Sequence, residues 1–470
     1  MKRLALTAAV LAAGASHAEQ LPMEHVLVSV PIHKKQAETA LPVTVLSGEE
    51  LQRSAATTLG ETLGNKPGLA NASFGPGVGR PVIRGQQGPR AISLQNGTLS
   101  ADVSGLSPDH GVTVEALLAD AIEVLRGPST LLYGGGAIGG VVNVIDNRIP
   151  RAAIDGVEGA LEYRYDDASD MDSGVFRLEG GNGSMAFHLS GTTRETDDLD
   201  IPGKAIDESA VEEQEELLGG HEEGGEHEEE EIENTDGFIA NTDGDADVVT
   251  VGAAYHFESR GFLGLSGSFL ETEYGIPPGA HGHEEHAGEE GEEEEEFIRL
   301  DVDMDRYDAM LHLHDLVPGF IDTARATLTY TDYEHVELEG AEVGTRFKRD
   351  TWESRIELVH EGEHNGVVGL QTRSDQFEAI GEEAYVPETD SLELGLFWVE
   401  DFDWGDWHVE LGGRVDYVER DPEARRADEE DFTFFSLSAA TGYQLSRSWN
   451  AGLALSRSAR APATEELYSN

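Results

Sequence analysis

The chain has 470 residues, of which 39% are hydrophobic, with 92 acidic residues against 32 basic residues and no cysteine. The formal net charge of −60 excludes nucleic acid as a default partner, because phosphate binding requires a basic surface. The lack of cysteine excludes a disulfide scaffold and cysteine-ligated zinc or iron–sulfur sites. Beyond residue 20 no apolar stretch reaches the ~20 residues of a spanning helix, whereas a β-barrel needs only weak alternation.

Residues 1–18 have the features of a secretory signal peptide. Lys2 and Arg3 are basic, a short apolar run follows, and Ser16-His17-Ala18 provides small residues at a cleavage site. We therefore expect the mature chain to function outside the cytoplasm.

Residues 24–150 indicate a compact α/β domain. Short β-rich runs at 43–46 and 91–94 alternate with a helical stretch over Glu49–Asn65, and glycines are frequent between them. The sequence thus predicts an N-terminal domain that differs in construction from the rest of the chain.

From residue 156 to 458 the chain consists of repeated segments of about ten residues in which apolar and polar side chains alternate. Val157–Tyr165 and Val249–Phe257 are examples, and thirteen such segments can be counted. The links after even-numbered segments are tight, whereas those after odd-numbered segments include the long, charged stretches 195–247 and 274–297. This pattern predicts a transmembrane β-barrel in contact with outer-membrane lipid, with short turns at the periplasmic end and long loops outside.

Thirteen strands cannot close a bacterial single-chain barrel, which uses an even number. An open sheet edge in lipid would leave backbone groups unpaired at a cost of several kcal/mol each. We therefore expect further strands beyond Asn470.

Several motifs, in a specific order and spacing, resemble the TonB-dependent outer-membrane receptor family. In the N-terminal domain they are Pro81-Val82-Ile83-Arg84-Gly85, then Ile122–Pro128, Tyr133-Gly134 and Ala137–Ile145. Near the end, Ser456-Arg457-Ser458, Arg460-Ala461-Pro462 and Glu466-Leu467-Tyr468 are similar to the mid-barrel signature of the family. The resemblance implies a 22-stranded barrel, with about 13 strands in this chain (residues 151–470), filled by a plug domain at residues 31–150.

The resemblance also implies a partner that supplies energy. Residues 24–30, Glu-His-Val-Leu-Val-Ser-Val, resemble a TonB box, the extended segment that pairs with the inner-membrane protein TonB by strand addition. A first strand of the plug is the alternative interpretation of this segment.

Ser107-Pro108-Asp109-His110 is similar to the plug motif of the zinc-receptor branch of the family (ZnuD-type). The resemblance implies that Asp109 and His110 help to hold the ion. A carboxylate and an imidazole suit Zn²⁺, with ligand distances of about 2.0 to 2.2 Å. The alternative is a loop aspartate beside a structural histidine.

The seventh predicted strand carries a second pair of candidate ligands. Ala324, Ala326, Leu328 and Tyr330 form its lipid-facing phase, so the alternate positions face the lumen. His335 and Glu337 belong to that inward phase and lie near the outer end, where they could reach an ion on the plug. Hydration of the lumen is the alternative role for these polar residues.

The two long acidic links carry a third group of candidate ligands. Residues 207–233 contain fourteen acidic residues with His221 and His227, and residues 281–296 contain nine glutamates with His281, His283 and His286. Histidine interleaved with glutamate is a metal-binding composition, although charge runs are usually disordered and solvated. We expect these loops to collect divalent cations and to repel anionic siderophores.

The sequence contains no G-x-S-x-G motif, no H-E-x-x-H motif on a predicted helix and no P-loop, so it gives little support for an enzyme. Together, the family resemblance and the candidate ligands favour a receptor that takes up a divalent metal ion, most simply Zn²⁺. Ligand type does not separate zinc from nickel or copper. Haem or a metal chelate is an alternative cargo, and a surface binding protein or adhesin anchored by the barrel is an alternative function.

Overall fold

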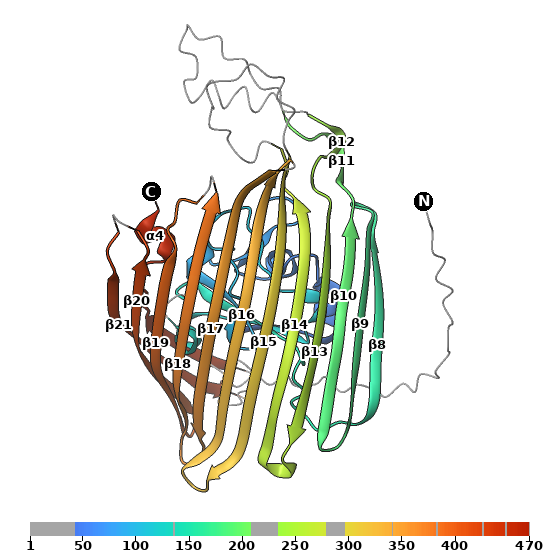
Figure 1. Cartoon of the computed structure of the whole chain (residues 1–470). Helices are drawn as coiled ribbons and strands as arrows, with labels where there is room; N and C mark the ends of the chain where they lie inside the picture. Colours follow the sequence, from blue (N-terminus) through green and yellow to red (C-terminus); the bar gives the residue numbers. More distant parts are fainter. Residues whose placement is uncertain are drawn as a thin grey trace.

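The computed structural model describes residues 43–134, 137–207, 234–278, 297–340, 342–381, 384–424, 427–446 and 449–469. A small α/β domain lies inside the curve of one large antiparallel sheet (Figure 1). The proposed signal peptide (1–18) and TonB box (24–30) lie outside the described residues. Among the described helices, none has the length and apolar character needed to cross a membrane.

The α/β domain, or plug, is built on a five-stranded sheet of order β1-β6-β7-β4-β5, in which only β4 and β7 are parallel. Its strands are β1 (Val43–Ser47), β4 (Ala91–Gln95), β5 (Thr98–Leu99), β6 (Ala121–Leu125) and β7 (Gly140–Ile145). A separate hairpin and three 3₁₀ helices complete it: β2 (Leu69–Ser73), β3 (Gly79–Ile83), η1 (Gly88–Arg90), η2 (Ala116–Leu118) and η3 (Gly127–Tyr133). β6 and β7 are buried throughout, which accounts for their almost continuous apolar sequences.

The helical stretch expected over residues 49–65 is divided in the structure into two short helices. α1 (Gly48–Ser54) ends where Ala55 becomes extended, and α2 (Leu59–Gly64) starts after Thr58. The Thr58 hydroxyl accepts a hydrogen bond from the backbone N–H of Glu61 at 3.3 Å. This side-chain cap satisfies a free N–H at the start of a helix, so it favours a break at this point.

The large sheet confirms the predicted count of thirteen barrel strands, each antiparallel to its neighbours in chain order. The strands are β8 (Asp155–Asp166), β9 (Met171–Asn182), β10 (Met185–Thr196), β13 (Gly244–His256), β14 (Gly261–Gly275), β15 (Ile298–Val317), β16 (Ile321–Glu339), β17 (Glu342–His360), β18 (Asn365–Gly381), β19 (Thr389–Trp404), β20 (Trp407–Pro422), β21 (Glu430–Ser446) and β22 (Trp449–Arg457). Several are much longer than the expected ten residues, with 20 in β15. At about 3.3 Å per residue, such strands extend well beyond a ~25 Å apolar band.

The lengths of the links between strands only partly follow the predicted alternation of short and long. β9–β10 and β15–β16 are joined by tight turns, as predicted, but β16 and β17 are joined by only residues 340–341, at the end where long loops were expected. The stretch 195–247 also contains a hairpin that the sequence did not reveal, β11 (Leu199–Lys204) with β12 (Asp236–Ile239). The lipid-facing and inward phases of β16 are as predicted, since Leu328 is exposed while Thr329 and Thr331 are buried.

Candidate metal site

The plug residue His110 lies in an irregular segment that is anchored at both ends. The Asp102 carboxylate accepts hydrogen bonds from the backbone N–H groups of Ser104 at 3.1 Å and Thr113 at 3.2 Å. Arg80 donates to the Ser104 carbonyl at 2.9 Å. Because these bonds tie the segment to itself and to β3, they fix the direction in which its side chains project.

His110, His335 and Glu337 meet at the boundary between the plug and β16. One ligand atom from each lies within 4.8 Å of the other two. The three residues are 0%, 0% and 4% exposed. His335 and Glu337 share the inward face of β16 because they are two residues apart on a strand. The structure thus brings together three of the sequence-predicted candidate ligands.

The hydrogen bonds of His110 favour a cation at this point. Its Nδ1 lies 3.2 Å from the Val103 carbonyl oxygen, which can only accept, so Nδ1 carries the hydrogen. In the neutral ring Nε2 is then an acceptor, and it lies 2.8 Å from Oε1 of Glu337, a second acceptor. The pair is satisfied when the imidazole is protonated and donates to Glu337, so positive charge is favoured here. A backbone carbonyl behind the other nitrogen is typical of metal-binding histidines.

The electrostatic surroundings of His110 also favour positive charge. Burial by itself lowers the pKa of the imidazole, but the hydrogen bond with Glu337 and the negative charge of Asp109 raise the pKa above its ordinary value. A bound cation would be stabilised by the same two carboxylates.

His335 contributes a ring nitrogen to the same three-ligand group. Its Nδ1 lies 3.0 Å from the Tyr333 hydroxyl, and its Nε2 has no hydrogen-bond partner among the residues that the structure describes. The His335 and His110 rings lie 4.4 Å apart between centroids. Phe347 of β17 packs against both rings at 5.1 and 5.6 Å, which closes the cluster on one side. The arrangement therefore provides two imidazoles and one carboxylate, a ligand set that suits Zn²⁺ and leaves one position open.

Asp109 is buried (1% exposed), but its carboxylate is not within the three-ligand group. It accepts a hydrogen bond from the Ser107 hydroxyl. The Tyr274 hydroxyl of β14 accepts from the backbone N–H of Gly111 at 3.0 Å and so holds the segment beside it. Asp109 thus adds negative charge next to the group, whereas the sequence-based expectation makes it a ligand.

Tyr274 and Phe347 were missed by the sequence analysis. Both are buried aromatic residues at inward positions on their strands, next to inward polar positions. That contrast with the neighbouring polar positions is the signal that could have identified them.

The five histidines of the acidic stretches, His221, His227, His281, His283 and His286, lie outside the described residues. Their role in metal binding stays a prediction.

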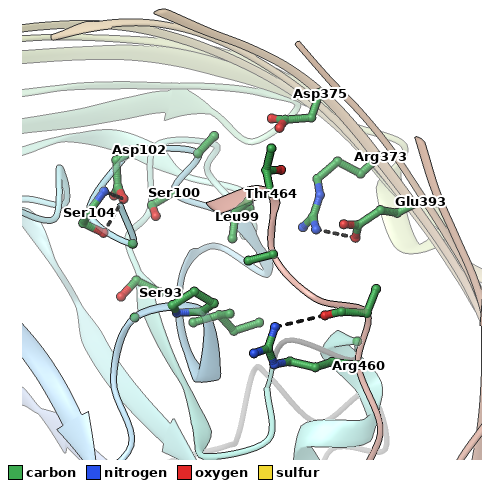
Figure 2. Close-up of a pocket in the computed structure, with 18 of the residues that line it drawn as sticks. Ser93, Leu99, Ser100, Asp102, Ser104, Arg373, Asp375, Glu393, Arg460 and Thr464 are labelled. Atoms are coloured by element: carbon green, nitrogen blue, oxygen red, sulfur yellow. Dashed lines mark hydrogen bonds and ion pairs between the residues drawn. The ribbon is translucent and has the colours of Figure 1, made fainter. Parts of the chain in front are cut away.

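A cavity of about 230 Å³ lies between the plug, strands β17 to β20 and residues 460–465, and none of the three ligand residues lines it. Its wall carries both signs of charge, and Figure 2 shows Arg373 paired with Glu393 there. Arg420 donates to the same carboxylate at 2.6 Å. Arg349 pairs with Asp375 and Arg414 with Asp416, each at 2.7 Å, and Arg460 pairs with Glu466 at 2.5 Å. Because these cations already have carboxylate partners, they offer little net attraction for an anionic ligand.

Comparison with known proteins agrees with this architecture. Residues 35–141 match the TonB-dependent Receptor Plug Domain family, and residues 236–470 match the TonB dependent receptor-like, beta-barrel family. Over 134 residues the chain is 31% identical to the vitamin B12 transporter BtuB of Vibrio vulnificus (strain CMCP6). This aligned segment covers 27% of this chain and 22% of that protein.

Solved structures with the same fold include the copper transporter OprC, with a TM-score of 0.67 at 14% identity, covering 88% of this chain and 62% of that one. The hemophore receptor HasR of Serratia marcescens has a TM-score of 0.67 at 16% identity, covering 92% and 65%. The chain spans less than two thirds of the length of these proteins. With a plug, a barrel sheet and both family matches, the chain belongs to the TonB-dependent receptors of the Gram-negative outer membrane, a family of transporters and not of enzymes.

Proposed function

We propose that the chain belongs to an outer-membrane transporter that takes up a bare divalent metal ion, Zn²⁺, with energy supplied by TonB through residues 24–30. The observation that carries this proposal is the three-ligand group His110, His335 and Glu337, which is buried between plug and barrel. Zn²⁺ is bound by imidazole and carboxylate in tetrahedral geometry, in which ligand atoms are about 3.3 Å apart. In the group, His110 Nε2 and Glu337 Oε1 are 2.8 Å apart, and one ligand atom from each of the three residues lies within 4.8 Å of the other two.

The division of ligands between two domains suggests how binding is coupled to transport. His110 belongs to the plug, while His335 and Glu337 belong to the barrel wall. Any force that displaces the plug separates the imidazole of His110 from the other two ligands. Removing one of three protein ligands weakens the site sharply, so movement of the plug would release the ion into the lumen.

Haem and metal chelates are weaker alternatives. The fold neighbours include a copper transporter and a hemophore receptor, but identities of 14% and 16% relate only the fold. The three ligands are at most 4% exposed, and Phe347 packs against both imidazole rings, so a bare ion fits where a porphyrin does not. In the cavity, Arg373 (Figure 2), Arg349 and Arg414 are paired with carboxylates rather than open to the propionates of haem.

A surface binding protein anchored by the barrel would need no ligand group shared by plug and wall. That function would use the outer loops alone. The buried three-ligand group therefore favours transport over adhesion.

The proposal is tested by zinc uptake in energised cells that express the full-length receptor with either His110→Ala or His335→Ala. Uptake at scarce zinc should fall ~10-fold or more, since each change removes a direct ligand. His314→Ala, which alters an exposed histidine near the opposite end of β15, is the matched control and should transport normally. Unchanged zinc uptake in both site variants, or growth on haem that depends on the same histidines, would contradict the proposal.

A further inference from the structure

A second group of metal-type ligands lies at the other end of the barrel strands. His360 is the last residue of β17, His364 lies in the turn to β18, and Glu400 is on β19. One ligand atom from each lies within 4.8 Å of the other two. Phe347, which packs against the His110 and His335 rings, lies on the same strand as His360. The two residues are roughly 40 Å apart at about 3.3 Å per residue, so this group is separate from the group of His110, His335 and Glu337, called the plug site below.

The group belongs to the outward surface of the sheet. On β17 the outward phase runs through Ile356 and Leu358 to His360, and on β19 it runs through Leu396 and Trp398 to Glu400. Exposed tryptophans at a strand end mark the interface between lipid and water in outer-membrane barrels. An acidic residue and two histidines at this level therefore border the aqueous phase rather than the lipid tails.

The separations between the polar atoms suit a metal ion. His360 Nε2 lies 3.1 Å from Oε1 of Glu400, and His364 Nε2 lies 3.7 Å from Oε2. Tetrahedral Zn²⁺ with bonds of about 2.0 to 2.1 Å holds its ligands about 3.3 Å apart. Oε2 of Glu400 is buried and has no hydrogen bond within the described part of the chain, so one carboxylate oxygen remains to be satisfied.

Two neighbours shape this group without contributing a ligand. Gly366 lies between His360 and Glu400 in the register of three adjacent strands. A Cβ at Gly366 would lie 2.3 Å from His360 Nε2 and 2.6 Å from Glu400 Oε2, so only glycine leaves this space open. The His364 ring stacks on Phe402 at 5.1 Å, which holds the turn histidine over β19.

We propose that His360, His364 and Glu400 form a second binding site for a borderline divalent cation such as Zn²⁺. The bound ion joins the β17–β18 turn to β19 on the outer surface of the barrel. Two imidazoles and a carboxylate select Zn²⁺, Cu²⁺ or Ni²⁺ over Ca²⁺ and Mg²⁺, which prefer oxygen ligands alone. The site does not depend on the transport function proposed for His110.

Tryptophan fluorescence of the full-length receptor in detergent tests the site locally. Trp398 is two residues from Glu400, and Trp404 stacks on Phe402, so Cu²⁺ bound here quenches nearby indoles. We expect saturable quenching by Cu²⁺ that Zn²⁺ reverses and Mg²⁺ does not. The plug site and acidic loops are too distant along the strands to quench this pair.

Three variants and two controls decide the assignment. His360→Ala combined with His364→Ala, and separately Glu400→Gln, should weaken Cu²⁺ quenching ~10-fold or more. Gly366→Ala keeps all three ligands but should weaken it as well, because the added methyl group occupies the space between two of them. His110→Ala and His408→Ala, the latter at the same end of the barrel but outside the group, should quench normally.

Quenching that is unchanged in the double histidine variant would overturn the proposal, as would the lack of saturable quenching in the unaltered receptor. Normal affinity in Gly366→Ala would show that the observed geometry is not the binding geometry.

Discussion

At the residue scale, the site formed by His110, His335 and Glu337 depends on which ring nitrogen of each histidine faces the other ligands. A backbone carbonyl holds Nδ1 of His110 and a tyrosine hydroxyl holds Nδ1 of His335, so Nε2 is the candidate ligand atom on both rings. Glu337 supplies an oxygen within 4.8 Å of a ring nitrogen of each. These second contacts fix the orientation of each ring before an ion arrives, which reduces the entropy cost of binding.

Asp109 and His110 are adjacent in sequence but should differ in their effect on binding. His110→Ala should weaken zinc binding ~10-fold or more, because it removes a direct ligand. Asp109→Asn should weaken it less, because it removes only a neighbouring charge. Calorimetric titration of the refolded receptor with a zinc chelator present, so that only the tight site fills, measures both. An equal or larger loss for Asp109→Asn would identify Asp109 as a ligand.

At the element scale, barrel strands hold the plug by its backbone carbonyls. Arg306 donates to Leu99 at 2.8 Å, Arg349 to Asp102 at 2.7 Å and Arg355 to Leu132 at 2.7 Å. The guanidinium of Arg355 also lies over the Tyr133 ring, 4.7 Å from its centroid. Through Arg349 the strands also hold the plug segment that carries His110.

Arg355→Gln should loosen the plug near η3 without unfolding the barrel. The change leaves the buried Leu132 carbonyl and Glu357 with fewer partners, at a cost of about 1–3 kcal/mol. Hydrogen exchange of peptides covering residues 127–134 should become faster. Arg346→Gln removes an exposed ion pair with Glu334 and is the matched control, for which we expect no change. Equal exchange rates in both variants would show that the arginine contact does not hold the plug.

Residues 24–30 form the element that we expect to receive force from TonB. Val28→Pro should abolish energised zinc uptake, because proline lacks the backbone N–H that strand pairing requires. Zinc binding to the purified receptor should be unaffected, since the ligands are elsewhere. Uptake assays and calorimetry on the same variant separate the two effects, and normal uptake would exclude this segment as the coupling element.

At the scale of the whole molecule, the net charge of −60 is concentrated in part in two acidic stretches. A negative field at the outer face raises the local concentration of divalent cations and speeds their association. Many carboxylates and imidazoles without a fixed arrangement bind metal weakly. Collection of ions by the loops and tight binding by the plug site would then be separate steps.

Deleting residues 281–296 should slow uptake at scarce zinc and leave the rate at abundant zinc almost intact. The effect should fade as ionic strength rises, because salt screens the attraction between exposed charges. Uptake measured across zinc and salt concentrations tests this. An equal fall in the maximal rate at every zinc concentration would mean that the loop builds or gates the tight site.

The sequence by itself determined the class of fold, the number of barrel strands and the phase of β16, because alternation between lipid and lumen is a local pattern with a period of two residues. It also placed His335 and Glu337 on the inward face. The sequence did not predict the break between α1 and α2 or the hairpin β11–β12. The break depends on a helix cap and the hairpin on a strand pairing, and periodicity encodes neither.

Only the tertiary structure decided which side chains meet. His110 and Glu337 are 227 residues apart, and their contact depends on how the plug is seated in the barrel. The placement of Asp109 beside the group, rather than in it, depends on the same docking. His360 and Glu400 become neighbours only through the register of three strands, with the missing side chain of Gly366 between them. Such contacts are set by packing and strand register over long sequence distances, whereas local sequence patterns specify only which face each residue occupies.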